Sequence, residues 1–144
     1  MSDTKRVGGV IVTHGQLANE LLAAAEAVFG DLSNIVAGSV GWHHDVQMAR
    51  DEISRAIKNV SEGLGVLILT DMFGGTPTNI AAMFLHDGET EIVTGVNLPM
   101  VVKLATDTGQ LSLKELAAEV EEQGKTAICR AVDLLQPPKM KKDG

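Results

Sequence analysis

A chain of 144 residues in which 44% are hydrophobic is long enough for one domain with a sizeable core and too short for two. Its net charge of −7 and its 3% content of aromatic residues argue against a basic face for nucleic acid and against platforms for stacked bases. The single cysteine, Cys129, excludes an intramolecular disulfide. Because no run approaches membrane-spanning length, we expect a cytoplasmic protein.

The first half of the chain alternates apolar runs with helical patterns. The run VGGVIVT at 7–13 predicts a buried strand, and IVAGSV at 35–40 predicts a second one. Between them, Leu17 to Phe29 carry apolar residues at helical spacing, and Gly30 is a natural helix stop. After the second strand, residues from about Asp45 to Val60 place their apolar side chains on one side of another predicted helix.

The middle of the chain holds the clearest strand, GVLILT at 65–70, which is apolar as expected when both faces of a sheet are covered. The segment DMFGGTPTN follows and opens a helix, with Thr76 as its expected N-cap and Pro77 at the first helical position. A fourth strand is predicted at 91–95.

The last third is predicted to contain two more helices and a strand. One helix starts at VNLPM, and another runs over 113–123 and is stopped by Gly124. The alternating segment 126–132 is predicted to be a strand at a sheet edge or in an interface. Residues 136–144 are polar and broken by proline, so we expect a flexible tail after a single domain at 1–135.

This alternation predicts an α/β fold, with an open, mostly parallel sheet and helices on both faces. In such a sheet, ligands bind at the carboxyl ends of the strands, where the strand order reverses. His14 follows the first predicted strand and Asp71 follows the third. If the strand order is 2-1-3-4, these two strands are neighbours, and the imidazole and the carboxylate face each other in one crevice.

Such a pair has a chemical use. A carboxylate that accepts the N–H of one ring nitrogen fixes the tautomer and leaves the lone pair of the other nitrogen free to attack an electrophile. Gly15, Gly74 and Gly75 allow close approach to an anion, and the hydroxyl of Thr76 at a helix start favours bound phosphate. A nucleophilic nitrogen, an orienting acid and a phosphate cradle suggest a phosphohistidine intermediate.

The same residues have plainer interpretations, and both stay open at this point. His14 could be a capping or surface residue, and DMFGG could be an ordinary turn. The glycines fit neither the phosphate loop of ATPases nor the dinucleotide fingerprint. His43 and His44 are adjacent and have no third ligand at suitable spacing, so no metal site is expected. His43 or Trp42 could line the crevice, because the end of the second strand lies on the same edge.

The segments VIVTHGQLANELLAAAE, GVLILTDMFGGTPTNIAA and EIVTGVNLPMVVKL resemble the mannose-type IIA component of the bacterial phosphoenolpyruvate-dependent sugar phosphotransferase system. The resemblance runs in order from about residue 6 to residue 133. It rests on T-H-G after the first strand, D-x-x-G-G-[ST]-P-x-N after the third, and G-V-N-[LI]-P-M after the fourth.

The resemblance implies a phosphotransferase in which His14 accepts a phosphoryl group from the phosphocarrier HPr and passes it to a IIB component. Asp71 would orient the ring, while Gly15, Gly74, Gly75 and Thr76 would line the phosphoryl pocket. It also implies a homodimer that exchanges a C-terminal antiparallel strand, and membrane contact only through a permease complex. The best-known members often continue into a IIB domain, whereas this sequence ends at Gly144, so we expect the IIB partner to be a separate protein. No cofactor is expected, because the donor already carries an activated phosphoryl group. The sugar is not identified.

Two alternatives remain from the sequence. One is a regulatory protein whose His14 is phosphorylated as a signal without a transport partner. The other is the phosphotransfer subunit of a dihydroxyacetone kinase, which would show a Gly-Ser-rich loop where this chain has GGTPTN.

Overall fold

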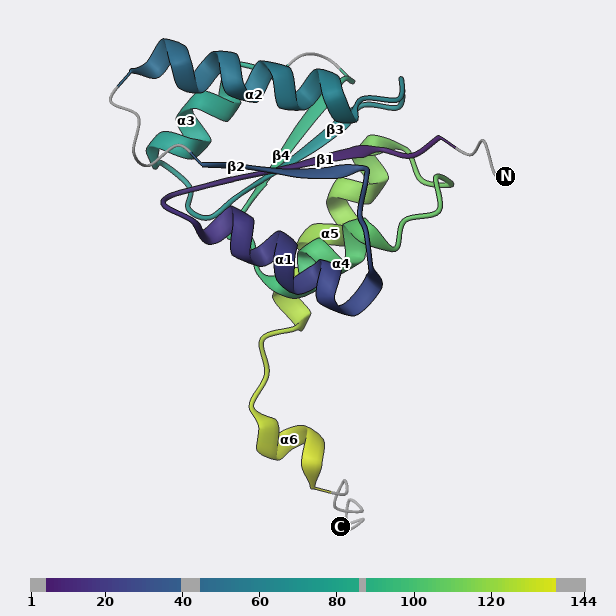
Figure 1. Cartoon of the computed structure of the whole chain (residues 1–144). Coiled ribbons are helices and arrows are strands. Elements are labelled where there is room, and N and C mark those ends of the chain that lie inside the picture. The colour runs from purple at the N-terminus through teal and green to yellow at the C-terminus, as the bar shows by residue number, and fades with distance from the viewer. Residues whose placement is uncertain (1–4, 40–44, 86–87, 137–144) are drawn as a thin grey trace.

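The computed structural model describes residues 5–39, 45–85 and 88–136. Its centre is a parallel sheet of four strands in the order β2-β1-β3-β4 (Figure 1). The strands are β1 (Gly8–Thr13), β2 (Ile35–Ser39), β3 (Val66–Thr70) and β4 (Thr90–Thr94). The predicted α/β class and the predicted order 2-1-3-4 are therefore confirmed.

Helices cover both faces of this sheet (Figure 1). One face packs against α2 (Val46–Val60) and α3 (Thr76–Ala82), and the other against α1 (Leu17–Phe29), α4 (Leu98–Ala105) and α5 (Leu113–Thr126). Because successive side chains of a strand point to opposite faces, Val10 and Val12 join the first cluster while Ile11 joins the second. Both clusters are apolar, which explains the unbroken hydrophobic runs of β1 and β3.

Two predicted helix boundaries differ from the structure. Thr76 is the first residue of α3 and not its cap, because Gly75 is the N-cap residue and has no side chain to form a capping bond. Gly124 does not stop α5, which continues to Thr126. A Cβ on Gly124 would lie 2.6 Å from Sδ of Met100, so this glycine is there for the close packing of α5 on α4.

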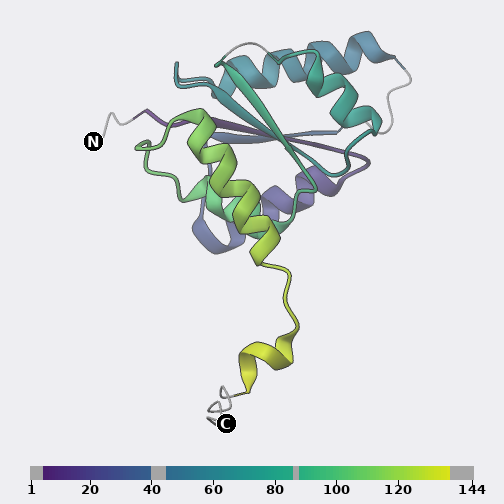
Figure 2. The same cartoon turned by 180° about the vertical axis from the view of Figure 1, so that it is seen from behind.

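The strand predicted at 126–132 is absent from the single chain. Thr126 is the last residue of α5, residues 128–130 have no regular structure, and α6 (Ala131–Leu135) follows. In Figures 1 and 2, α6 stands away from the body of the domain, and none of its residues is buried. A strand needs a neighbouring edge to pair with, and among the described residues this segment pairs with none. Exchange of the segment in a dimer remains a prediction. The predicted tail covers 136–144, and its residues 137–144 lie outside the described residues.

Candidate functional site

His14 lies at the point where β1 turns into α1. It directly follows Thr13, the last residue of β1, and Gly15 makes the turn with a φ of +53°. The carbonyl oxygen of His14 accepts a hydrogen bond from the backbone N–H of Leu17, the first residue of α1, at 3.4 Å. The positive φ favours glycine at position 15, since a side chain there would be strained.

Asp71 is brought to His14 by the pairing of β1 with β3. Val12 is the register partner of Thr70, so the residues that follow these two strands leave the sheet together. Oδ2 of Asp71 lies 2.8 Å from Nδ1 of His14 and accepts a second hydrogen bond from the backbone N–H of His14 at 3.0 Å. The structure therefore brings together the imidazole and the carboxylate that the sequence placed after separate strands.

The electrostatics of the pair keep the carboxylate ionised. Burial opposes ionisation of Asp71, but hydrogen bonds from the backbone and ring of His14 and the charge of that ring outweigh it, so the pKa of Asp71 is lowered. An ionised carboxylate only accepts, so the neutral ring carries its proton on Nδ1. The side chain of His14 is 48% exposed, and its Nε2 keeps a free lone pair.

The glycine-rich loop after β3 closes over the same ring. Gly74 has a φ of +85°, a conformation that favours glycine. Gly75 has extended backbone, but a Cβ there would lie 3.0 Å from Cε1 and 3.4 Å from Nε2 of His14. Thr76 is exposed and begins α3, whose first N–H groups have no partner within the helix. The loop residue Gly75 therefore lies beside the edge of the ring that carries Nε2, immediately before the start of α3.

Three buried threonines beside the site were not singled out from the sequence. Thr13 accepts a hydrogen bond from the N–H of Ala18 at 2.7 Å and donates to the carbonyl of His14 at 3.1 Å. The hydroxyls of Thr70 and Thr78 lie 2.7 Å apart, and that of Thr78 donates to the carbonyl of Met72. The signal was present in VIVT and LILT, two apolar runs that both end in threonine just before a site residue.

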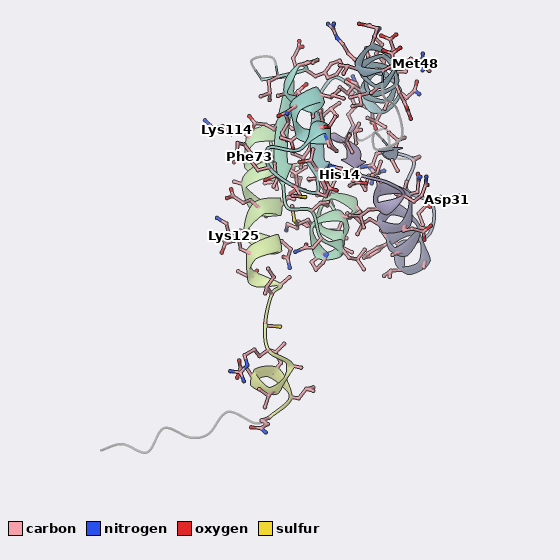
Figure 3. All side chains as sticks on the ribbon, turned by 90° about the vertical axis from the view of Figure 1, so that its left-hand side faces the viewer. His14, Asp31, Met48, Phe73, Lys114 and Lys125 are labelled. Atoms are coloured by element: carbon pink, nitrogen blue, oxygen red, sulfur yellow. The ribbon has the colours of Figure 1, made fainter. Side chains whose placement is uncertain are left out.

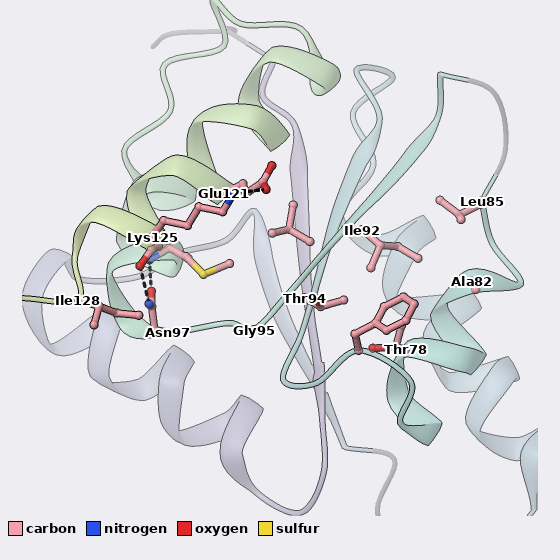
Figure 4. Close-up of a pocket in the computed structure, with 14 residues that line it drawn as sticks. Thr78, Ala82, Leu85, Ile92, Thr94, Gly95, Asn97, Glu121, Lys125 and Ile128 are labelled. Atoms are coloured by element: carbon pink, nitrogen blue, oxygen red, sulfur yellow. Dashed lines mark hydrogen bonds and ion pairs between the residues drawn. The ribbon is translucent and has the colours of Figure 1, made fainter.

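Apolar side chains are exposed beside the site. Met72 and Phe73, which follow Asp71, are 59% and 84% exposed, and Figure 3 shows Phe73 and His14 on the same edge of the domain. A groove of about 630 Å³ has Phe73 in its lining. Figure 4 shows it running from Thr78 along β4 to α5 and Ile128. The groove contains neither member of the His14–Asp71 pair.

Other expectations concern metals and membranes. Among the described residues, no three His, Cys, Asp or Glu side chains are grouped so that they could hold a metal ion. Trp42, His43 and His44 lie outside the described residues. In the ranges that the structure describes, no helix is both long enough and apolar enough to cross a membrane.

The fold and the pair together define an α/β protein with a histidine hydrogen-bonded to a carboxylate at the switch point of a parallel sheet. Residues 8–121 match the family model described as "PTS system fructose IIA component". The chain therefore belongs to the family of fructose- and mannose-type IIA components of the sugar phosphotransferase system. IIA components of this family are phosphotransferases that work with HPr and IIB partners.

Individual relatives agree with this assignment. The chain is 32% identical to the fructose-specific EIIA component of Bacillus subtilis over 74% of each protein. It is 30% identical to the mannose-specific EIIAB component of Escherichia coli K12 over 94% of this chain but only 47% of that protein. Among solved structures, the mannose/sorbose-specific IIA subunit from Enterococcus faecalis superimposes with a TM-score of 0.78 at 24% identity, covering 94% of this chain and 99% of that one. This last likeness concerns the fold alone.

Proposed function

We propose that Nε2 of His14 accepts a phosphoryl group from phosphorylated HPr and passes it to a IIB component for the uptake and phosphorylation of a sugar. The observation that carries this proposal is the 2.8 Å contact between Nδ1 of His14 and Oδ2 of Asp71. It fixes the proton on Nδ1, so that Nε2 is the nitrogen with a free lone pair. Family membership supports phosphotransfer as the class of reaction.

The transfer is a displacement between two nitrogens. The lone pair of Nε2 forms a bond to phosphorus while the phosphorus–nitrogen bond of the donor phosphohistidine breaks, and the donor imidazole keeps that electron pair. Positive charge develops on the His14 ring, and the carboxylate of Asp71 offsets it through Nδ1–H. When the IIB component takes the phosphoryl group, the same steps run with His14 as the leaving group.

The proposed phosphoryl pocket consists of Gly15, Gly74, Gly75 and Thr76. Gly15 follows His14 directly, and Gly74, Gly75 and Thr76 follow Asp71 in the loop that leads into α3, so these residues offer backbone and hydroxyl groups without a bulky side chain. Gly75 supports this assignment most directly, because its α-carbon is packed against the reactive edge of the imidazole. Preorganised N–H groups are suited to the charge of three phosphoryl oxygens. The donor is already activated, so we propose that neither metal nor cofactor takes part.

We further propose that the protein acts in the cytoplasm as a homodimer joined through its C-terminal segment. Apolar side chains of this segment are exposed in the single chain: Ile128 at 80%, Val132 at 42%, Leu134 at 72% and Leu135 at 82%. β4 is an edge strand of the sheet, and the groove beside it has a mostly apolar lining. An exposed apolar segment and an open strand edge support mutual exchange between two copies. We take residues 1–135 as the folded unit.

Intact-mass measurement after incubation with phosphorylated HPr tests the proposed acceptor. The wild-type chain should gain one phosphoryl group that is labile in acid and stable in base, as a phosphoramidate is, and His14→Ala should gain none. His86→Ala removes a histidine that lies outside the three family motifs, so it serves as the control and should be phosphorylated like the wild type. A full phosphoryl gain in His14→Ala would refute the assignment. Addition of a IIB component then separates transport from signalling, since a regulatory protein would keep the group.

A further inference from the structure

Strands β1 and β3 both end in a threonine that is buried directly beneath the site. Thr13 and Thr70 are each 0% exposed, and they precede His14 and Asp71. Thr78 of α3 is 7% exposed and lies against Thr70. A buried hydroxyl is stable only when it is hydrogen-bonded, so the partners of these groups show what they hold in place.

The hydroxyl of Thr13 joins His14 to helix α1. It accepts the N–H of Ala18, which is itself 0% exposed, at 2.7 Å and donates to the carbonyl of His14 at 3.1 Å. Gln16, the N-cap residue of α1, provides no side-chain cap, so Thr13 satisfies an N–H group of the first turn in its place. Loss of this hydroxyl leaves a buried N–H without a partner and frees the turn that carries the imidazole.

The hydroxyl of Thr78 holds the loop that carries Asp71. Its proton goes to the carbonyl of Met72, the residue after Asp71, so the hydroxyl of Thr70 must donate to Thr78 across their 2.7 Å contact. A chain of two hydroxyls therefore runs from the end of β3, through α3, back to the start of the glycine-rich loop. In D-x-x-G-G-[ST]-P-x-N, Thr78 occupies the variable position before the asparagine, so the motif itself gives it no role.

We propose that Thr13 and Thr78 are positioning residues, whose buried hydroxyls hold His14 and Asp71 at the distance that keeps the ring proton on Nδ1 and Nε2 free for transfer. Each hydroxyl binds a carbonyl in one of the two loops, at His14 itself and at Met72 next to Asp71. Neither hydroxyl touches the reacting atoms. Small displacements of a reacting group are costly, on the order of a hundredfold in rate for 1 Å.

Matched substitutions separate the hydroxyl from the volume of the side chain. Thr13→Val and Thr78→Val keep the shape and remove the hydroxyl, while Thr13→Ser and Thr78→Ser keep the hydroxyl. Thr90→Val is the control, because Thr90 is 5% exposed and starts β4 beside Val66, at the opposite end of the parallel strands from His14 and Asp71. We expect transfer from phosphorylated HPr to slow about ten- to a hundredfold in the two site valine variants, to recover in the serine variants, and to be unchanged in Thr90→Val.

The rate measurement rests on the proposed function, so a second readout is chosen that does not. Nitrogen-15 NMR of the neutral His14 ring shows which nitrogen carries the proton, without any phosphoryl donor. We expect Nδ1–H in the wild type, the serine variants and Thr90→Val, and a mixture of tautomers in Thr13→Val and Thr78→Val. If the wild type accepts no phosphoryl group, the proposed function fails while the NMR comparison still decides this inference.

Two results would overturn the inference. One is folded valine variants that retain the Nδ1–H tautomer and the wild-type rate. The other is an equal loss in Thr90→Val, which would show that general stability is responsible. If Thr13→Val does not fold, a comparison of Thr13→Ala with Thr13→Ser tests the same hydroxyl. The Thr78 variants independently test whether the hydroxyl of Thr78 positions Asp71.

Discussion

The α-carbon of Gly75 is packed against the imidazole of His14 so closely that a Cβ would lie 3.0 Å from Cε1 and 3.4 Å from Nε2. The backbone of Gly75 is extended, with a φ of −85°, so any residue could adopt its conformation. Glycine is needed at this position for space beside the ring, whereas at Gly74 it is favoured by the positive φ of +85°. The two adjacent glycines therefore serve different physical purposes.

Gly75→Ala should impair transfer more than it impairs folding. The added methyl group would push the half-exposed ring of His14 by a few tenths of an ångström and occupy space beside Nε2. We expect the transfer rate to fall about tenfold or more. The free energy of unfolding should change by less than about 1 kcal/mol, because the ring can move toward solvent. Transfer kinetics and urea denaturation on the same preparation measure both effects.

Gly38→Ala is the matched control for this substitution. Gly38 is a buried glycine of β2, and a Cβ there would meet only the carbonyl oxygen of Ile11 at 3.9 Å, an ordinary contact. Its transfer rate should equal that of the wild type. An equal loss of rate in both variants, or no loss in Gly75→Ala, would mean that the contact of Gly75 with the ring is unimportant for transfer.

Asp71→Asn should preserve the fold and slow the reaction. The amide has the same shape, and its oxygen can still accept the Nδ1–H of His14. The variant lacks the negative charge that offsets positive charge on the ring during attack, a loss of about 1–3 kcal/mol by comparison with other charge-assisted hydrogen bonds. Transfer should therefore slow by roughly ten- to a hundredfold at neutral pH.

Asp45→Asn provides a control for the change of carboxylate to amide. Asp45 caps α2 by accepting a hydrogen bond from the N–H of Gln47 at 2.9 Å, and asparagine is an equally good cap. This variant should transfer at the wild-type rate. If Asp71→Asn transferred the phosphoryl group as fast as Asp45→Asn, the carboxylate of Asp71 would have no role in transfer and Asp71 would be only a residue of the turn.

The lowered pKa of Asp71 also predicts how stability depends on pH. The pKa of this carboxyl is lower in the folded chain than its ordinary value of 3.8, so its contribution to stability is fully present above that value. As pH falls through the lowered pKa, the carboxylate is protonated and the contribution is lost. The difference in free energy of unfolding between the wild type and Asp71→Asn should shrink as pH falls below about 4, where the carboxylate begins to be protonated. A difference that stays constant to the most acidic pH at which both fold would contradict this.

Much of this fold could be predicted because local pattern and global topology agree. The apolar runs that became β1 and β3 have both faces covered, so their hydrophobicity shows in the sequence without knowledge of their neighbours. The order of the strands then brings His14 beside Asp71, although 57 positions separate them. The pair was accessible from the sequence since both residues directly follow strands.

The parts that were not predicted depend on contacts between distant residues. Gly124 appeared to be a helix stop, but its role is set by Met100 of another helix, which no local pattern shows. Segment 126–132 alternates as a strand does, yet a strand also requires an edge to pair with. The hydroxyl chain of Thr70 and Thr78 joins a strand to a helix across a turn, so its hydrogen bonds become visible only in three dimensions.

Transfer to His14 should not require a metal ion. The donor carries an activated phosphoryl group, and backbone N–H groups with the hydroxyl of Thr76 are proposed to hold its oxygens. Once phosphorylated HPr has been made and purified, its reaction with this chain should proceed at the same rate with and without a chelator. A loss of rate that Mg²⁺ restores would count against the proposed pocket, and donor stability in the chelator alone is the control.

The exposed C-terminal segment predicts the oligomeric state. If Leu134 and Leu135 become buried against a second copy, the chain should sediment at twice its mass of 15.2 kDa. Each leucine that is buried contributes about 1.5–3 kcal/mol, whereas burial of an unpaired carboxylate is strongly unfavourable. Leu134→Asp with Leu135→Asp should therefore shift the protein to a monomer in analytical ultracentrifugation. Val28→Asp changes an apolar residue of α1 that is 66% exposed and should leave the dimer intact. A monomeric wild type, or a double variant that remains dimeric, would show that this segment does not join two copies.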